Sequence, residues 1–161
     1  MSKELCQQFG FDRSAIGERL NLLGLGGPAV PMIAAELQSH VIQPNVDSII
    51  EEFDEALAQT EAFQSLALGE GQVNHLKMTQ RTYLLSLGQE FDTLEYFESS
   101  LRLCAYHERV VVSLSLYQSL YTQLQNMLLT LINEELSQNH HSFYELENFI
   151  INITSNDMSL A

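Results

Sequence analysis

The residue with the clearest chemical potential in this sequence is the histidine at position 107. An apolar helical stripe leads up to it, with members three or four residues apart: Leu94, Phe97, Leu101 and Cys104. His107 follows Cys104 by three residues, so a helix would turn its imidazole toward the core. A neutral imidazole can coordinate iron through one ring nitrogen while the other donates a hydrogen bond that fixes the tautomer. A core-facing histidine is also a common structural hydrogen-bonding residue, and His107 alone leaves both interpretations open.

The elements that would position His107 are helices. Only three prolines and eight glycines interrupt the chain, and the segments between them have helical rather than alternating periodicity. The sequence therefore predicts an all-α fold with about seven or eight helices. Besides the helix that contains His107, the predicted helices cover about residues 12–24, 31–42, 44–57, 61–68, 73–87, 113–138 and a last stretch from 143 onward.

Particular residues mark the predicted helix ends. Gly24 and Gly88 favour helix termination, and Pro44 suits the first turn of the helix that follows it. Two capping boxes stand before the helix that contains His107 and before the last helix. They are Asp92 with Glu95, and Ser142 with Glu145.

Length and composition indicate one domain without a nucleic-acid partner. The 161 residues are 45% hydrophobic and 17% charged, and the net charge of −14 repels a phosphate backbone. Cys6 and Cys104 form no metal-binding spacing, which fits a reduced, cytoplasmic setting. The N-terminus lacks the apolar stretch of a signal peptide, and no apolar run is long enough to span a membrane. We expect a soluble single domain over 1–161.

Cations are missing from the last third of the chain. All seven lysines and arginines lie before residue 110. The polar positions of 110–161 are mainly Ser, Gln, Asn and Thr, which a helix can bury against a protein partner at lower cost than charges. A weakly charged, solvated face explains the same composition equally well.

The order of these segments resembles the sensor globin of globin-coupled sensors. The resemblance covers about residues 12–161 and rests on the order and spacing of several short stretches. They are Asp12 to Leu20, Phe53 in the helix after a proline, Gln72 to Lys77, Tyr96-Phe97-Glu98, His107 to Val110 and Ser115 to Tyr121. It implies a globin-like bundle with an extra N-terminal helix, in which 1–27 are a lead-in helix and linker and 28–161 the globin core. In this family the globin leads into an output domain, often a diguanylate cyclase or a chemotaxis transducer, so the chain resembles the truncated sensory piece.

The resemblance also implies a site for haem b. His107 would be the iron ligand on the proximal side, Leu76 would pack over the opposite face, and Phe53 would contact the macrocycle. The remaining residues expected to line the haem pocket are Leu57, Gln72, Tyr83, Phe97, Leu103, Val112 and Tyr117. The partners implied are a diatomic gas and a second copy of the chain, with the last two long helices as the homodimer interface.

Several positions depart from the family pattern. Asp54 stands where the family commonly has a tyrosine that hydrogen-bonds bound oxygen, and a carboxylate is a poor replacement donor there. Asp54 pointing to solvent is the other interpretation. Val111 and Ser113 replace a usual Gly and Pro after the ligand. Gln72 could donate to a distal ligand or lie at a solvated loop edge. His75 could be a second axial ligand, contact a haem propionate or simply be exposed.

Two functional hypotheses remain open from the sequence. The first is a haem-binding sensor of oxygen, carbon monoxide or nitric oxide that signals through a homodimer. The second is a haem-free sensory globin that dimerises or binds another apolar ligand. An enzyme is disfavoured, because the chain has no phosphate-binding loop and no nucleophile-histidine or paired-carboxylate motif of recognisable spacing.

Overall fold

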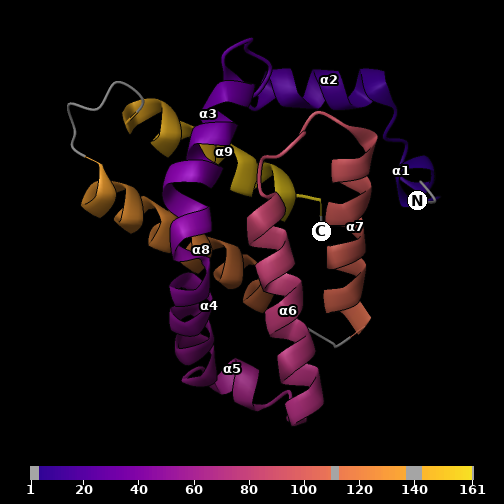
Figure 1. Ribbon diagram of the computed structural model, residues 1–161. Helices are drawn as coiled ribbons and strands as arrows, with labels where there is room; N and C mark the ends of the chain where they lie inside the picture. The colour runs from indigo at the N-terminus through magenta and orange to yellow at the C-terminus, as the bar shows by residue number, and fades with distance from the viewer. Residues whose placement is uncertain (1–3, 110–112, 137–142, 161) are drawn as a thin grey trace.

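The protein is built from helices, as the computed structural model shows (Figure 1). The structure describes residues 4–109, 113–136 and 143–160, apart from the side chain of His107. Within these residues there is no strand, which confirms the predicted all-α class. The elements are α1 (Glu4–Gln8), α2 (Arg13–Leu22), α3 (Val30–Glu36), the π-helix η1 (Leu37–Ile42), α4 (Gln43–Ala58), α5 (Glu61–Gln64), α6 (Glu70–Ser86), α7 (Leu94–Arg109), α8 (Leu114–Glu135) and α9 (Phe143–Met158).

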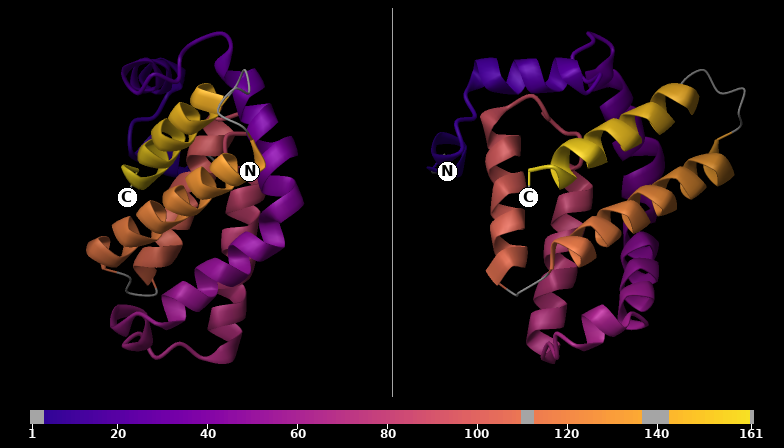
Figure 2. Two further views of the ribbon diagram at one scale, coloured as in Figure 1. Left: turned by 90° about the vertical axis from the view of Figure 1, so that its left-hand side faces the viewer. Right: turned by 180° about the vertical axis from the view of Figure 1, so that it is seen from behind.

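The helices form a globin-like bundle, also as predicted. α6 and α7 run antiparallel on one side, α3 and α4 form a second long column, and α2 crosses one end (Figure 1). α8 and α9 lie side by side as an antiparallel pair that crosses the other helices obliquely (Figure 2). α9 also packs on α3, and α6 packs on α4. No helix in the described part of the chain is long and apolar enough to cross a membrane.

Most predicted helix ends lie within two residues of the observed ones. Asp12 caps α2, since its Oδ1 accepts a hydrogen bond from the N–H of Ala15 at 2.8 Å. The capping box predicted from Asp92 is wrong by one residue, because Thr93 Oγ1 accepts from the N–H of Tyr96 at 3.2 Å. α8 ends at Glu135 rather than near residue 138, and the segment predicted as a helix over 61–68 is helical only in α5. The other capping residue predicted, at position 142, lies outside the described residues.

The predicted break before Pro44 is absent. The chain is helical without interruption from α3 to α4, and the π-helix η1 joins the two. A proline inside a helix provides no N–H and crowds the carbonyl four residues before it, which the wider π turn relieves. The N–H of Gln43 bonds the carbonyl of Gln38, five residues back, and the Asn45 side chain donates to the carbonyl of Val41 at 2.8 Å. The helix therefore continues past the proline, and these two donors bond the carbonyls of Gln38 and Val41 on its N-terminal side.

The short helix α1 was not predicted, and a buried carboxylate holds it against α7. Glu98 has no exposed surface and accepts hydrogen bonds from the backbone N–H groups of Cys6 at 2.8 Å and Leu5 at 3.3 Å. Arg102, one turn further along α7, pairs with Oε1 of this carboxylate at 3.0 Å, the oxygen that also accepts from Leu5. Burial alone would raise the pKa of Glu98, but the backbone donors outweigh it and keep the pKa below its ordinary value. α1 is thus fixed to α7, the helix that contains His107.

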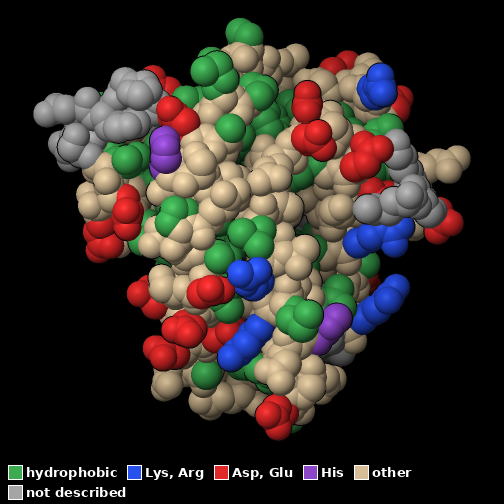
Figure 3. Space-filling model, viewed as in Figure 1, with side chains coloured by type: hydrophobic (Ala, Val, Ile, Leu, Met, Phe, Trp, Pro, Cys, Tyr) green, Lys and Arg blue, Asp and Glu red, His purple; other side chains and the backbone are tan. Residues whose placement is uncertain are grey.

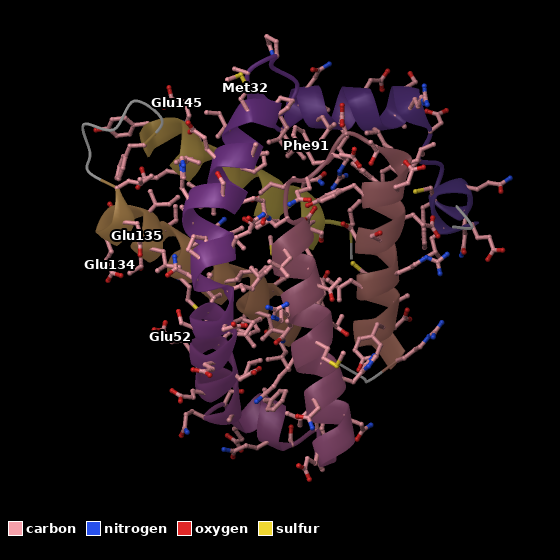
Figure 4. The ribbon with its side chains drawn as sticks, viewed as in Figure 1. Met32, Glu52, Phe91, Glu134, Glu135 and Glu145 are labelled. Atoms are coloured by element: carbon pink, nitrogen blue, oxygen red, sulfur yellow. The ribbon has the colours of Figure 1, made fainter. Side chains whose placement is uncertain are left out.

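The segment between α6 and α7 approaches α9 closely. Gly88, just after the end of α6, has a φ of +74°, and a Cβ at this position would lie 2.6 Å from Cζ of Phe149. Phe91 points inward from the same segment (Figure 4), and its ring meets the Phe149 ring edge-on with centroids 5.7 Å apart. A glycine is required here for both its backbone angle and its lack of a side chain.

Candidate functional site

A groove of about 710 Å³ runs between α6 and α7. Its walls combine aromatic and aliphatic side chains with hydroxyl groups and charges. The α6 wall consists of His75, Met78, Thr79, Thr82, Tyr83 and Ser86, and the α7 wall of Glu95, Tyr96, Ser99, Ser100, Arg102, Leu103 and Tyr106, with residues 89, 90 and 93 at one end. The ring of His75 meets that of Tyr106 across the groove, with centroids 5.0 Å apart.

A second, smaller cavity of about 40 Å³ lies between α4, α6 and α8. Its lining is almost entirely apolar or aromatic: Ile50, Phe53, Gln80, Tyr83, Leu84, Leu103, Tyr117, Leu120, Tyr121 and Leu124. Tyr83 and Leu103 line both this cavity and the groove, so they form the partition between them. Oε1 of Gln80 is buried and has no hydrogen-bond partner within the described residues.

A carboxylate from the last turn of α9 joins the two groove walls. Oδ2 of Asp157 accepts hydrogen bonds from the hydroxyl of Tyr83 at 2.6 Å and from that of Tyr96 at 2.8 Å. Oδ1 accepts from the amide of Asn156 at 3.2 Å. Asp157 has no exposed surface, and this burial raises its pKa to about 6, although the three hydrogen bonds and the charge of Arg19 act in the opposite direction.

Further hydroxyl groups lie beside the small cavity. The hydroxyl of Tyr117 lies 2.9 Å from Sγ of Cys104 and donates to that of Tyr121 at 3.3 Å. Burial raises the pKa of all three groups, so the tyrosines and the thiol hold their protons at neutral pH. The space behind the groove is therefore lined by neutral hydrogen-bonding groups together with apolar side chains.

The structure gathers some of the predicted pocket residues around these two cavities. Phe53, Tyr83, Leu103 and Tyr117 line the small cavity, and Tyr83 and Leu103 also line the groove. The side chain of His107 and the whole of Val112 lie outside the described residues. The backbone at position 107 is helical, one turn beyond Leu103 on α7.

Other predicted pocket residues line neither cavity. Leu57 and Leu76 are buried in the packing of α4 and α6, and Phe97 faces the opposite side of α7, where its ring lies 5.3 Å from that of Phe11. Gln72 is exposed, and its Oε1 accepts from the N–H of Gly69 at 2.9 Å, which caps the start of α6. Their roles toward haem stay predictions.

The structure places Asp54 differently from the solvent-facing alternative, whereas His75 is exposed as one of its alternatives expected. Asp54 does not simply point to solvent, because its Oδ2 pairs with Nζ of Lys77 at 3.5 Å. This pair and that of Asp47 with Arg81, at 3.2 Å, bind α4 to α6. Partial burial raises the pKa of Asp54, and the Lys77 charge opposes that rise. His75 is exposed, yet it lines the groove, on the wall that Leu76 was expected to provide.

Two groups that organise the site, Tyr121 and Asp157, were not predicted from the sequence. Tyr121 follows Tyr117 by one helical turn, and this spacing alone could have placed both on one face. Asp157 follows Ile153 by four residues, so this carboxylate lies on the same face as the apolar stripe of the last helix. A carboxylate within an apolar stripe is a signal of a buried polar contact. Nothing in the sequence identifies Tyr83 and Tyr96 as its partners.

The all-helical bundle is globin-like in its fold. The family model described as Protoglobin matches residues 12–161, and the chain belongs to this family. The chain is also similar to the heme-based aerotactic transducer HemAT of Halobacterium salinarum (strain ATCC 700922 / JCM 11081 / NRC-1), with 29% identity over 134 residues. This similarity covers 82% of the chain and 27% of the transducer, so the chain spans about a quarter of that relative's length.

Proposed function

We propose that this domain binds haem b in the groove between α6 and α7 and senses a diatomic gas at the iron. The observation that carries the proposal is the groove itself, which opens between the two antiparallel helices and has Leu103, one turn before His107, in its wall. The name of the relative, a heme-based aerotactic transducer, supports the same function. When bound, haem would supply an iron atom that coordinates oxygen, carbon monoxide or nitric oxide.

The size and chemistry of the groove fit this group. Ligand sites of drug-sized molecules have volumes of roughly 300–1,000 Å³, a range that includes the groove and excludes the small cavity. Tyr83, Leu103 and Tyr106 provide flat or apolar surface for a macrocycle, and Arg102 provides a positive charge near carboxylate substituents. Within the described residues no group of three His, Cys, Asp or Glu side chains could hold a bare metal ion.

The residues of this chain would take different parts in binding. His107 would hold the iron through one ring nitrogen, as a neutral imidazole. Phe53, Tyr83, Leu103 and Tyr117 would exclude water behind the macrocycle. Asp54 is bound to Lys77 and offers no hydrogen-bond donor to a ligand. Gln80, which lines the small cavity together with Phe53, has a buried side-chain amide that could be the donor instead.

The same proposal includes a homodimer formed by α8 and α9. These helices lie side by side at the edge of the bundle, and Leu114, Tyr144 and Ile151 expose 60%, 63% and 42% of their surface. At the far end of the pair Glu134, Glu135 and Glu145 point outward (Figure 4). A two-fold interface would have to keep these like charges at its rim. Sedimentation or light scattering of the chain and of Ile151→Glu tests this: a dimer that the variant dissociates is expected, and a monomeric parent chain contradicts it.

An output region beyond residue 161, such as a diguanylate cyclase or a chemotaxis transducer, would receive the signal in a cytoplasmic protein. The face shown in Figure 3 carries many charged side chains, as the surface of a protein in water does. Acidic side chains are spread over this face, and cations lie toward its middle and right side. The length of the relative, of which this domain covers only 27%, supports a further region of this kind.

One observation favours a haem-free module as the second candidate. The volume behind the groove is only about 40 Å³, because Tyr83, Tyr117 and Tyr121 occupy the space and satisfy their hydroxyl groups there. A macrocycle that penetrates beyond the groove would have to displace at least one of these rings. A globin that has lost haem would keep such a filled interior.

An absorption spectrum of the chain reconstituted with haem separates the two candidates. The haem proposal predicts a stoichiometric Soret band that shifts with carbon monoxide after reduction and is lost or strongly weakened in His107→Ala. The matched control is His75→Ala, which removes the other imidazole of this region and should leave the band in place. No stoichiometric band in the parent chain would refute haem binding, and a band lost only in His75→Ala would reassign the ligand.

A further inference from the structure

The last turn of α9 is attached to both walls of the groove at one atom. Oδ2 of Asp157 receives the hydroxyl of Tyr83 from α6 and the hydroxyl of Tyr96 from α7. Both tyrosines line the groove, and Tyr96 is buried while Tyr83 is partly buried. One oxygen atom therefore bridges the two helices between which a ligand would enter.

The same turn has a second attachment, on its other side. Nε of Arg19, from α2, donates to Oδ1 of Asn156 at 2.7 Å, and its terminal nitrogen donates to the carbonyl of Asn156 at 3.2 Å and to Oγ of Ser159. α9 thus ends in a turn held by α2, α6 and α7 together. Such a turn is fixed more firmly than a typical helix end, which frays.

We propose that Asp157 couples the groove to the end of α9: it positions Tyr83 and Tyr96 and passes a change in groove width to the last turn. This inference rests on the proposed function, because it names how the same site would regulate an output region. In the proposed function an output region follows α9 in the chain, so this turn is the part of α9 nearest to it.

The Asp157 bridge can stretch very little. Its two hydrogen bonds are 2.6 and 2.8 Å long, and they share one acceptor atom. A ligand that moves α6 and α7 apart must lengthen at least one of them, or Asp157 must follow one wall. A buried carboxylate that loses a donor is left poorly solvated, which costs more than the bond alone is worth. The turn therefore has two alternatives, bound to both tyrosines or released from one, and occupancy of the groove selects between them.

Amide hydrogen exchange of the last turn tests the coupling first without any ligand. Tyr83→Phe and Tyr96→Phe remove one hydroxyl each and keep the ring, so packing is preserved. Exchange at residues 155–159 should accelerate about tenfold or more in each, the effect of one lost hydrogen bond to a charged group. By reciprocity, Asp157→Asn should accelerate exchange in α6 and α7 near the two tyrosines.

The matched control is Tyr121→Phe, because this tyrosine is as buried as Tyr96 but no hydrogen bond joins it to Asp157. Its exchange at residues 155–159 should equal that of the parent chain. Acceleration of the same size in all three tyrosine variants would show general loosening and overturn the inference. Unchanged exchange in Tyr83→Phe and Tyr96→Phe would overturn it as well.

A second comparison adds haem, with binding followed separately by the Soret band. The inference predicts that haem changes exchange at residues 155–159 in the parent chain and that the double variant Tyr83→Phe/Tyr96→Phe loses this change. A full Soret band without a change in the last turn would overturn the inference and leave haem binding intact. A missing band would refute the proposed function, while the ligand-free comparison would still decide whether Asp157 couples the two walls to α9.

Discussion

Replacing Asp157 by asparagine should change how the stability of the domain depends on pH. Burial raises the pKa of this carboxyl to about 6, whereas an unfolded aspartate has a pKa of about 3.9. The folded state therefore holds the proton more tightly, and the resulting stabilisation is present at low pH and lost as the pH rises through about 6. The difference of roughly two pKa units corresponds to about 3 kcal/mol in total, of which about 1.4 kcal/mol is lost between about pH 5 and about pH 7.5. Asparagine keeps the shape and an acceptor oxygen for Tyr83 and Tyr96, and it does not titrate.

Urea unfolding of both chains at the two pH values measures this quantity. The acidic surface makes other carboxylates titrate too, but these contributions are common to both chains and cancel in the difference. From about pH 5 to about pH 7.5 the stability of the Asp157→Asn chain should rise by about 1.4 kcal/mol relative to that of the parent, because only the parent loses this contribution. A difference that does not change between the two pH values would show that Asp157 is ionised at both and that its hydrogen bonds outweigh its burial.

Four other substitutions test the packing of the domain. Gly88→Ala should destabilise the domain by at least about 2 kcal/mol, since the residue has a positive φ and a new methyl group would press on a phenyl ring of α9. Gly17→Ala, inside α2 with open space around it, should instead stabilise the domain by about 0.5–1 kcal/mol. Thermal unfolding of the two variants side by side shows whether the two changes in stability have opposite signs. Asp54→Asn should change the unfolding free energy by less than about 1 kcal/mol, because its partner Lys77 is half exposed, and a larger loss in denaturant unfolding would assign the pair a structural role. Glu98→Ala should release α1 from α7, so limited proteolysis ought to cut the first ten residues faster than in the parent chain, and equal rates would mean that apolar contacts alone hold α1.

Much of the fold could be predicted from periodicity and from capping residues. The long apolar stripes of α4, α6, α8 and α9 have helical spacing, and Asp12 marks a start by a local hydrogen bond. The prediction of two helices divided before Pro44 is wrong because the rule that a proline ends a helix considers α-helical geometry only. A π-helix before the proline lets the helix continue. α1 was missed since five residues are too few for a periodic signal, and its stability comes from Glu98, more than ninety positions away.

Less of the site than of the fold could be predicted from the sequence. Phe53, Tyr83, Leu103 and Tyr117 could be placed near one another by the family resemblance and do meet in the structure. The bridge at Asp157 could not be predicted, because it depends on three helices that meet at one carboxylate. Contacts between residues so far apart in the chain give no local pattern in the sequence. For Phe97, the helical stripe correctly predicts that the side chain is buried, but it does not predict which neighbour covers it. In the structure that neighbour is Phe11 and not the haem pocket.

The π-helix η1 has a consequence for comparing this chain with its relatives. A π turn places one more residue in the same stretch of helix than an α turn does, and a π-helix commonly originates when one residue is inserted into a regular helix. Leu37 and Val41 before the proline and Val46 and Ile49 after it all remain in the core, so the extra residue is absorbed within 37–42. An alignment with a relative whose corresponding helix is regular should therefore carry a one-residue gap at this point, and an ungapped alignment would shift every equivalence on one side of it by one position.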